Sequence, residues 1–326
     1  MEPAIVAQPE AGIAVIEKTP VESLIAGQLS THTRKAYVAD IKQFIAFIGG
    51  EDRLCFVSKD TVVDFRDYLA KYERVTATGG VKRYQPTTIN RKLSVVRQLL
   101  AEAADKGVIN RNPAARVQGL QINRDYSPTQ GLSRHEARQV LDAIDTTTLI
   151  GKRDHALLSL LIRTGLRRDE VVRLTLASIG ERDGHKVLTV IGKGEKRRLT
   201  KLPVDVWRVL DEWLTAAELS EPESSVFAEV RKRGRGAEAV YFVNRVTPLT
   251  TDGVWHIVGR RVREAGITKN ITPHSLRHTF VTLALAGGAP LHKVQYCAGH
   301  ADPRTTERYD RQRDDLDNNA VDYIKL

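Results

Sequence analysis

Apolar residues recur at steps of three and four along the first third of the chain, the spacing of one face of an α-helix. One such stretch opens at Ser30 and ends at Gly49, a second begins near Ser58, and Gln85 opens a third. Their apolar positions are, in order, Tyr37, Ile41, Phe44, Ile45 and Ile48; Val62, Phe65 and Leu69; and Ile89, Leu93, Val96, Leu99, Leu100 and Ala103. The pattern predicts three amphipathic helices around a small core.

Stretches without a clear period separate this helical region from its surroundings. Residues 1–19 mix alanine, proline, glutamate and valine and predict a flexible tail, whereas glycine and proline punctuate a polar, basic run after residue 107. We therefore expect an N-terminal helical domain at 20–120, a linker at 121–131 and a larger domain at 132–326. A chain of 326 residues is long enough to bury two such cores.

The pattern after the linker mixes helices with a few strands. A capping box at Ser133 opens one helix, and a strongly apolar helix covers 153–162. Residues that favour strands flank a glycine-lysine-glycine turn and predict a hairpin at 186–203, and 241–243 predict a further short strand. Thr250 caps a later helix. The expected fold class is mainly α, with a small antiparallel β-sheet in the second domain.

The formal net charge is +10 and the pI is about 9.6, which favours a polyanionic partner. The basic excess does not decide the partner by itself, because a membrane surface attracts it too. Only Cys55 and Cys297 occur, so no disulfide framework is indicated and a reducing compartment fits. No apolar run is long enough to span a bilayer, and the N-terminus does not resemble a signal peptide. A cytoplasmic protein without membrane association is expected.

The residues with the most chemistry lie in the stretch from Thr272 to Tyr309. Thr272 and Pro273 predict the cap and first turn of a helix, so His274 and Arg277 share one face. An imidazole beside a planar, permanently charged fork suits a phosphate. A tyrosine hydroxyl, with an ordinary pKa of about 10, needs nearby cations and a base to act as a nucleophile. The stretch combines a phosphate-binding face with a tyrosine that such neighbours would activate.

One set of residues resembles the signature of the tyrosine recombinases, also called phage-type integrases, in their two-domain, Xer-like form. The set is Arg167, His274, Arg277, Gly299-His300 and Tyr309. The match covers about 132–315 and, more loosely, 20–120, and the motifs are specific as a set although none is specific alone. The resemblance implies a small helical, SAM-like core-binding domain before an α-helical catalytic domain that carries the β-sheet.

The resemblance also implies what each residue does. Tyr309 would attack the scissile DNA phosphate, form a 3′-phosphotyrosyl link and release a 5′-hydroxyl; the 5′-hydroxyl of a partner strand then attacks the link. Arg167 and Arg277 would stabilise charge on the non-bridging oxygens. His274 would act as general base and later as acid, and His300 would bond the phosphate. Because the link conserves bond energy, neither a metal, ATP nor any other cofactor is expected.

Other positions leave alternatives open. In the family a lysine at a hairpin turn protonates the leaving oxygen; Lys193 matches that position, and Lys196 is the fallback if the register differs. Glu170, one turn after the first arginine, would position basic neighbours, or simply form an intrahelical ion pair. Tyr296 and Tyr323 are rival nucleophiles by chemistry, but neither has the family spacing.

The third predicted helix carries Arg91, Lys92 and Arg97 away from its apolar stripe. They form either a solvated basic face or a surface that lies against a DNA groove. In the family the small N-terminal domain clamps DNA opposite the catalytic domain, which favours the second interpretation. The candidate DNA contacts are Thr87, Thr88, Asn90 and Arg91. The basic run at 231–235 is equally consistent with a solvated loop and with a phosphate-contact loop.

Two further surfaces are expected to meet a partner. Arg260, Arg261 and Arg263 line the outer side of the helix that follows Thr250, as basic surface that could approach DNA. Near the C-terminus a charged run leads to a small apolar anchor at residues 320–326. Recombinases of the family work as homo-tetramers on two DNA sites, and in related ones this tail docks into a neighbouring protomer. The candidate contacts in the tail, which could instead pack on its own domain, are Val321 and Ile324.

The resemblance therefore implies a site-specific recombinase acting on double-stranded DNA with a specific core site, in integration, excision or resolution of a mobile element or replicon. A type IB topoisomerase uses much the same catalytic set but relaxes one duplex by rotation. The small N-terminal domain and the tail favour the recombinase over it. A non-catalytic DNA-binding module is a third class, although binding alone would not require a tyrosine at that spacing.

Overall fold

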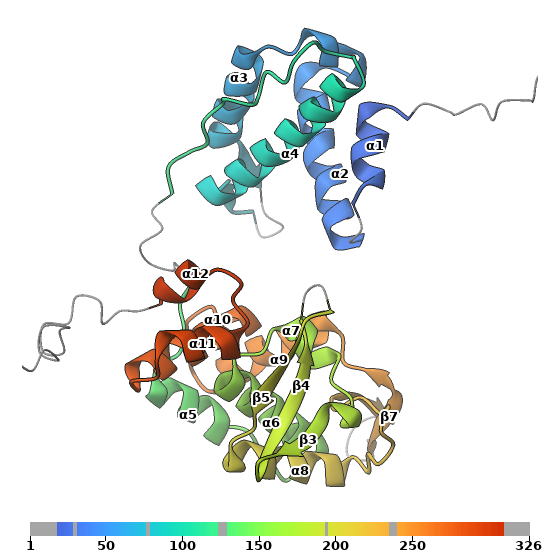
Figure 1. The fold of residues 1–326 in the computed structure, drawn as a ribbon. Helices are drawn as coiled ribbons and strands as arrows, with labels where there is room; N and C mark the ends of the chain where they lie inside the picture. The colour runs from blue at the N-terminus through green and yellow to red at the C-terminus, as the bar shows by residue number, and fades with distance from the viewer. Residues whose placement is uncertain are drawn as a thin grey trace, which may run out of the picture. The chain divides into compact units, whose positions relative to one another are not determined.

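The computed structural model divides the chain into two compact units, Met1–Asn123 and Arg124–Leu326 (Figure 1). The structure describes residues 18–28, 31–75, 79–122, 129–192, 195–234 and 240–309. Both units are mainly helical, and the strands form small antiparallel sheets, so the expected fold class is confirmed. Within these described ranges, no helix is both long and apolar enough to cross a membrane.

The N-terminal unit confirms the three predicted helices and adds elements that the pattern did not show. Its elements are α1 (Pro20–Ala26), α2 (Thr31–Ile48), the 3₁₀ helix η1 (Glu51–Phe56), α3 (Lys59–Lys71), β1 (Glu73–Val75), β2 (Val81–Arg83) and α4 (Pro86–Asp105). Ser58 caps α3 by accepting a hydrogen bond of 3.1 Å from the Thr61 amide. Helix α1 was missed because seven residues make only two turns, too few for a period to emerge.

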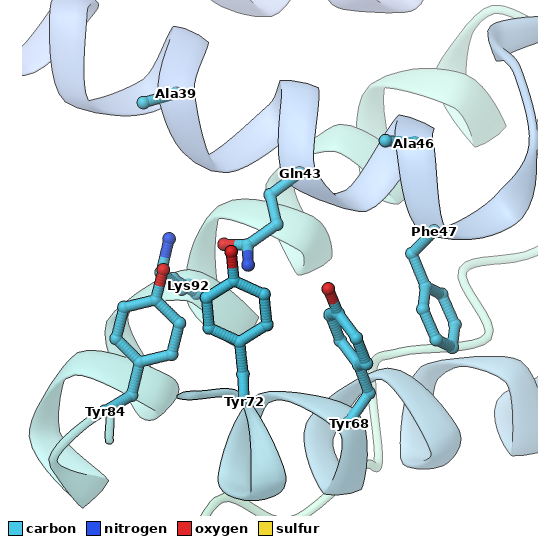
Figure 2. Close-up of a pocket in the computed structure, with 8 residues that line it drawn as sticks. All are labelled: Ala39, Gln43, Ala46, Phe47, Tyr68, Tyr72, Tyr84 and Lys92. Atoms are coloured by element: carbon cyan, nitrogen blue, oxygen red, sulfur yellow. The ribbon is translucent and has the colours of Figure 1, made fainter. Parts of the chain in front are cut away.

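Aromatic rings line one side of this unit and border an open pocket of about 640 Å³ (Figure 2). Phe47 of α2 packs against Tyr68 of α3, with ring centroids 5.2 Å apart. Tyr72 at the end of α3 stacks on Tyr84, just before α4, at 5.4 Å. The ammonium of Lys92 lies 5.0 Å from the centre of the Tyr84 ring. These contacts hold the β1–β2 hairpin, which connects Tyr72 with Tyr84, to the helices.

The sequence pattern suggested that the basic residues of α4 all point away from the core, but the structure shows that they do not. Lys92 is buried, and its ammonium lies 2.7 Å from the carboxylate of Asp40 on α2. Arg91, which is half exposed, donates to the same carboxylate at 3.1 Å. A buried carboxylate is costly unless cations and hydrogen bonds compensate it, so Asp40 draws both side chains towards α2.

The C-terminal unit confirms the predicted hairpin as β4–β5 and extends it. Its helices are α5 (Arg134–Asp142), α6 (Leu149–Thr164), α7 (Arg168–Val172), the 3₁₀ helix η2 (Leu176–Ser178), α8 (Val204–Ala216), α9 (Thr251–Glu264), α10 (Pro273–Ala286), α11 (Leu291–Ala298) and α12 (Pro303–Glu307). Its strands are β3 (Ile179–Arg182), β4 (His185–Ile191), β5 (Arg197–Lys201), β6 (Ala228–Arg233) and β7 (Val240–Pro248). The sheet order is β3-β4-β5, with β6-β7 as a separate two-stranded sheet.

Helix α6 forms the centre of this unit. Residues 156–162 are all buried, as expected for a helix that is apolar on most of its circumference, and α8 and α10 pack against it. Gly165 ends α6 in the left-handed conformation, with φ of 63°. A Cβ at Gly165 would stand 2.3 Å from the ring of Phe280, so the chain reverses here only with glycine. This turn leads directly into α7.

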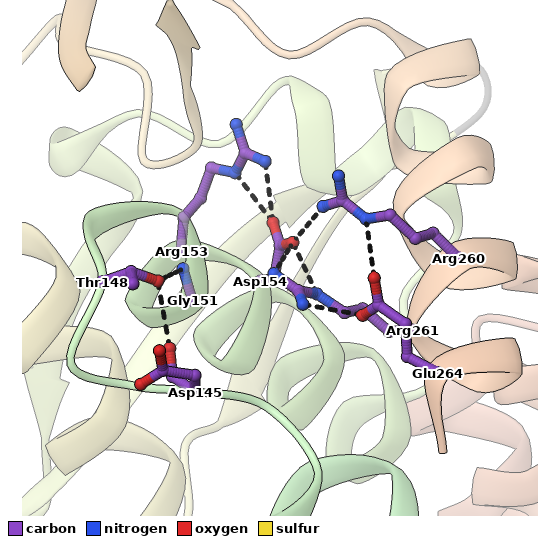
Figure 3. Close-up of polar contacts among 8 residues, drawn as sticks. All are labelled: Asp145, Thr148, Gly151, Arg153, Asp154, Arg260, Arg261 and Glu264. Carbon is purple, nitrogen blue, oxygen red and sulfur yellow. Dashed lines mark hydrogen bonds and ion pairs between the residues drawn. The ribbon is translucent and has the colours of Figure 1, made fainter. Parts of the chain in front are cut away.

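A buried carboxylate fixes α9 to α6 (Figure 3). The side chain of Asp154 on α6 is fully buried and accepts hydrogen bonds from Arg153 at 2.8 Å, Arg260 at 2.6 Å and Arg261 at 2.8 Å. Arg261 also donates to Glu264 at 2.8 Å. Asp154 therefore draws Arg261 inward, so that its side chain is only 14% exposed and does not line the outer side of α9 as expected. Arg260 keeps 44% of its side chain exposed, and contact of this surface with DNA stays a prediction.

Candidate active site

The turn after Gly165 places Arg167 at the N-cap of α7, where it connects two distant segments. Its guanidinium donates to Glu170 at 2.9 Å and to the backbone carbonyl of Gly299 at 2.8 Å. Its backbone amide donates to the other oxygen of Glu170 at 2.8 Å. The side chain of Arg167 nevertheless stays 42% exposed, so it can still meet a ligand.

Glu170 is nearly fully buried and holds a second arginine, which the sequence pattern did not single out. Arg198 on β5 donates to both oxygens of Glu170, at 2.9 and 2.8 Å, and to the Cys297 carbonyl at 3.3 Å. Burial raises the pKa of Glu170, but hydrogen bonds from Arg198 and the Arg167 amide, with the charges of both arginines, outweigh it and lower the pKa. Glu170 is therefore a carboxylate that joins α7, β5 and α11.

The first turn of α10 has the predicted geometry. Thr272 caps it by accepting from the Ser275 amide at 3.3 Å, and Pro273 takes the first helical position. Arg277 is 3% exposed and donates through Nη1 to the Gly165 carbonyl at 2.8 Å. Its Nη2 is buried without a hydrogen-bond partner among the described residues. Burial and the charge of Arg167 lower the pKa of Arg277 to about 10.

His300 and Tyr309 approach each other across α12. Helix α11 ends at Gly299 in the left-handed conformation, and the Nδ1 atom of His300 lies 2.8 Å from the hydroxyl of the buried Thr306. The ring of Tyr309 lies between two imidazoles, with centroids 4.7 Å from His278 and 6.0 Å from His300. Tyr309 is only 6% exposed, since its ring belongs to a small core between α10, α11 and α12.

Burial and nearby positive charges lower the pKa of both candidate histidines, which favours their neutral forms. Burial, followed by the charges of Arg277, Arg167 and His274, lowers the pKa of His300 to about 4. Although part of the His274 ring is exposed, burial of the remainder and then Arg277 and Arg167 lower its pKa as well. Neutral imidazoles can accept a proton or a hydrogen bond from a substrate, which imidazolium ions cannot.

The depressed pKa of His300 makes folding stability depend on pH. Its pKa of about 4 lies below the ordinary value of about 6.5, so between these values the unfolded chain binds the additional proton. The contribution of His300 to the free energy of unfolding is fully present above about pH 6.5 and is lost as the pH falls towards 4. We expect the urea midpoint of the wild type to fall more between pH 7 and 5 than that of His300→Gln. The control is His135→Gln, which removes an exposed histidine from α5. Urea midpoints that fall equally with pH in wild type and in His300→Gln would contradict the expectation.

A cleft of about 760 Å³ opens beside these residues. The residues around it that can contact an anion include Arg167, Lys196, Arg197, Arg198 and His300. Arg167 and Arg198 donate hydrogen bonds to the Glu170 carboxylate, and Arg277 interacts with its charge. Three guanidinium groups thus share one carboxylate among these described residues, so the region is net cationic. Within the described ranges no group of three or more histidine, cysteine or acidic residues is placed to hold a metal. The arrangement suits a phosphate.

The structure brings most of the sequence-predicted site together. Arg167, His274, Arg277, His300 and Tyr309 lie within electrostatic or ring contact of one another, with Glu170 behind the first arginine. The predictions that fall outside the described residues are those for Lys193, Tyr323, Val321 and Ile324. Two alternative candidates for the reaction line the cleft: Lys196, and Tyr296, which is 58% exposed.

The predicted DNA contacts of α4 have different surroundings. Thr87 is exposed and Thr88 half-buried at the start of the helix. The Asn90 amide exchanges two hydrogen bonds with the Leu120 backbone, at 2.8 and 2.7 Å. Asn90 therefore holds the segment after α4, whereas Thr87 and the half-exposed Arg91 are accessible.

Two family models match the chain. The model of the phage integrase family matches residues 130–315, which is more than half of the chain. The chain belongs to the phage integrase family. The second model, of the phage integrase N-terminal SAM-like domain, matches residues 21–107 and confirms the fold expected for the N-terminal helices of this family member.

Curated proteins and solved structures of the same kind resemble this integrase family member along most of its length. The tyrosine recombinase XerD of Listeria innocua is 29% identical over 287 residues, covering 86% of this chain and 88% of its own. The tyrosine recombinase XerC of Pelobacter propionicus is 31% identical over 283 residues, covering 86% and 85%. The XerH site-specific recombinase in a post-cleavage complex with difH superposes with a TM-score of 0.68 at 20% identity, covering 86% and 78%, which supports the fold alone.

Proposed function

We propose that this member of the phage integrase family uses Tyr309 to cut double-stranded DNA at a specific core site and to join it to a partner strand. The chain is a tyrosine site-specific recombinase, as its XerD and XerC relatives are. The observation that carries the assignment of Tyr309 is the set of groups around it. Arg277 has an unpartnered Nη2 within the described residues, and its charge interacts with Arg167, His300 and the tyrosine.

In the proposed reaction the hydroxyl oxygen of Tyr309 attacks the scissile phosphorus and loses its proton. The bond to the 5′-oxygen breaks, so a 3′-phosphotyrosyl link and a free 5′-hydroxyl form. Arg167 and Arg277 bond the two non-bridging oxygens, where negative charge builds up. Because Nη2 of Arg277 is screened from solvent here, contact with a phosphate requires the side chains around it to move. Attack of a partner 5′-hydroxyl on the link releases the tyrosine and completes exchange.

Proton transfer is assigned to groups whose charge state fits it. His274, whose lowered pKa favours the neutral form, accepts the tyrosine proton and returns it in the second step. His300, also neutral, bonds the phosphate and stays oriented by Thr306. A lysine of the β4–β5 turn protonates the leaving 5′-oxygen. Lys193 is the first candidate for this role, and Lys196, which lines the cleft, is the second.

The remaining assignments concern organisation. In this proposal 1–19 is a tail, 20–120 the core-binding domain, 121–131 a linker and 132–326 the catalytic domain. The protein acts in the cytoplasm as a homo-tetramer on two DNA sites. Its C-terminal tail docks on a neighbouring protomer through Val321 and Ile324, while α4 contacts the core site through Thr87, Thr88 and Arg91. Support comes from structural neighbours that were solved on a DNA core site, such as a lambda integrase dimer bound to a COC′ core site, with a TM-score of 0.65.

The proposed function is tested by covalent trapping on a nicked DNA duplex that carries the crossover sequence of the element encoding the protein. Wild type should give a denaturation-resistant adduct in the presence of a metal chelator, and Tyr309→Phe should give none. Tyr296→Phe, the exposed tyrosine of the cleft, is the matched control and should cleave like wild type. An adduct that persists in Tyr309→Phe would overturn the assignment. Plasmid relaxation without strand exchange would favour the topoisomerase class instead.

Arg198 is proposed as a positioning residue that sets the place of His300 through α11. Its fork contacts both Glu170 and the Cys297 carbonyl, and a Cβ at Gly299 would lie 3.2 Å from its guanidinium. We expect Arg198→Lys and Arg198→Gln each to slow adduct formation about tenfold, because neither reproduces the bidentate contact. A tenfold change in rate corresponds to about 1.4 kcal/mol of activation free energy. DNA affinity should change little.

A measurement of the His300 pKa separates this role from a general loss of stability. The charge of Arg198 is one of the causes that lower the pKa of His300. Arg198→Gln should raise that pKa, and Arg198→Lys, which keeps the charge, should not; an NMR titration of the imidazole distinguishes them. Lys201→Gln, an exposed cation on the same strand, should leave both rate and pKa unchanged. Wild-type rates in both Arg198 variants would refute the positioning role.

A further inference from the structure

The strands β6 and β7 form a two-stranded antiparallel ribbon that the proposed reaction does not use. Its outer register pairs Arg231 with Phe242, Lys232 with Tyr241 and Arg233 with Val240. Since opposite residues share a face and neighbours along a strand alternate, one face carries Arg231, Arg233, Val240 and Phe242. The other face carries Lys232 and Tyr241, with the ammonium 5.9 Å from the ring centre.

The ribbon is held at its base and open further out. Val230 and Val243, on the same face as the lysine, pack against the main core of the C-terminal unit. The register shift between Ala228 and Glu229 places three additional residues on β7, a bulge that bends such a ribbon. The outer half of the ribbon therefore extends from a base that is packed against the core.

Cations and large apolar side chains are exposed together on this outer half. Val240 is 64% exposed, and Tyr241 and Phe242 are each 44% exposed. The three consecutive cations of β6 are exposed too, and only the first, Arg231, pairs with a described carboxylate, that of Glu229 at 2.9 Å. Burial of such rings would be expected if they served the fold alone, so their exposure indicates a contact surface.

We propose that the outer β6–β7 ribbon is a second DNA-contact surface of the C-terminal unit, separate from the phosphate site around Arg277. The sequence left the run at 231–235 open between a solvated loop and a phosphate-contact loop. The described part of the run, 231–234, forms strand β6 and the turn after it rather than an irregular loop. A two-stranded ribbon has the width of a B-DNA major groove, and consecutive cations match the phosphates at its edges.

Charge distinguishes DNA from a protein partner. The outer half of the described ribbon contains Arg231, Lys232 and Arg233 against the single acid Glu229, a formal charge of +2. Arg245, nearer the base, pairs with Glu218. A second copy of this chain also carries a formal charge of +10 and would be repelled by it. Aromatic rings beside the cations are compatible with DNA, because they can contact thymine methyl groups and sugars. The partner follows from the proposed function, which requires duplex DNA.

The salt dependence of DNA binding tests this inference without knowledge of the core site. Each phosphate contact contributes about −0.9 to the slope of log Kobs against log salt concentration. On a random-sequence duplex, the triple variant Arg231→Gln, Lys232→Gln, Arg233→Gln should lower the magnitude of the slope by about 2 to 3. The matched control removes the same charge from exposed positions of α5 and α8 and should leave the slope unchanged. It is the triple variant Arg134→Gln, Arg138→Gln, Arg208→Gln.

The outcomes separate this inference from the proposed function. A wild type that does not bind the duplex at all would count against the proposed function itself. An unchanged slope in the ribbon variant, with strong binding by wild type, would overturn the inference alone. Equal slope changes in the ribbon variant and in the control would also overturn it, because they would report net charge and not a contact surface.

A photo-crosslink provides a second reading if the triple variant does not fold. Val240→p-benzoylphenylalanine places a reactive ketone at the most exposed apolar position of the ribbon, where little packing is disturbed. Irradiation with the duplex should produce a protein–DNA crosslink that high salt suppresses. Crosslinking to a second protein chain, or to no partner, would show that this face does not lie on DNA.

Discussion

Arg277→Gln is expected to slow formation of the covalent DNA adduct by about 10²–10³, the usual cost of removing one preorganised donor from a developing oxyanion. The side chain is 3% exposed, bonded to the Gly165 carbonyl through Nη1, and unpartnered at Nη2 within the described residues. A group fixed in this way loses little freedom when it meets a phosphate. The measurement is single-turnover adduct formation at saturating protein.

The control for this variant is Arg173→Gln, which removes the same charge from an exposed position at the end of α7. It should cleave at the wild-type rate, and both variants should bind DNA nearly as well as wild type, since Arg277 is one of many cations. Arg277→Lys should remain slow, because an ammonium cannot replace the fork. A loss below tenfold in Arg277→Gln would remove Arg277 from the catalytic set.

Asp154→Ala is expected to have the largest effect on stability, about 3–5 kcal/mol of unfolding free energy, because it removes one partner from a buried ion cluster. Arg153, Arg260 and Arg261 all donate to this carboxylate, as Figure 3 shows. Without it, the buried guanidinium of Arg153 and the mostly buried one of Arg261 would lose their compensating charge. Equilibrium unfolding in urea of the isolated protein measures the change.

A second acid of the same cluster is the matched comparison. Glu264 pairs with Arg261 at 2.8 Å but its side chain is 45% exposed. Glu264→Ala should cost no more than about 1 kcal/mol, as is usual for exposed ion pairs. Equal losses for the Asp154 and Glu264 variants would mean that burial is not what makes the cluster important. An Asp154→Ala protein as stable as wild type would contradict the account of how α9 is fixed to α6.

Long amphipathic segments were predictable from the sequence because their apolar period runs over many turns. The helices α2, α3 and α4 match their predicted stripes, and Phe44, Phe65 and Leu93 are fully buried as expected. Local capping chemistry was equally predictable: Ser133 and Thr272 cap α5 and α10 as proposed. These features depend on residues a few positions apart, so they need no knowledge of tertiary contacts.

The features that the sequence did not predict depend on contacts between distant segments. Burial of Lys92 is a consequence of Asp40, and pairing of Arg260 and Arg261 is a consequence of Asp154, residues 52 or more positions away. No period in α4 or α9 reveals these acids. Short elements such as β3 were missed for another reason, since four residues provide too few positions for an alternation to be seen.

Arg198 is a case in which a usable signal existed. In the β4–β5 hairpin it lies opposite Val190, a fully buried residue, and cross-strand partners share a face. An arginine that shares a face with the core requires a buried acid, and Glu170 is that acid. If the pairing of β4 with β5 is derived from the position of the turn, it places Arg198 on the buried face and therefore in the site.

The central claim is that Tyr309 is the residue that becomes linked to DNA. Mass spectrometry of the nuclease-treated and protease-digested adduct identifies the modified residue directly. We expect a nucleotide remnant on the peptide that contains Tyr309, with the link at the 3′-phosphate of the cut strand. A remnant on Tyr296 or on any other residue would contradict it.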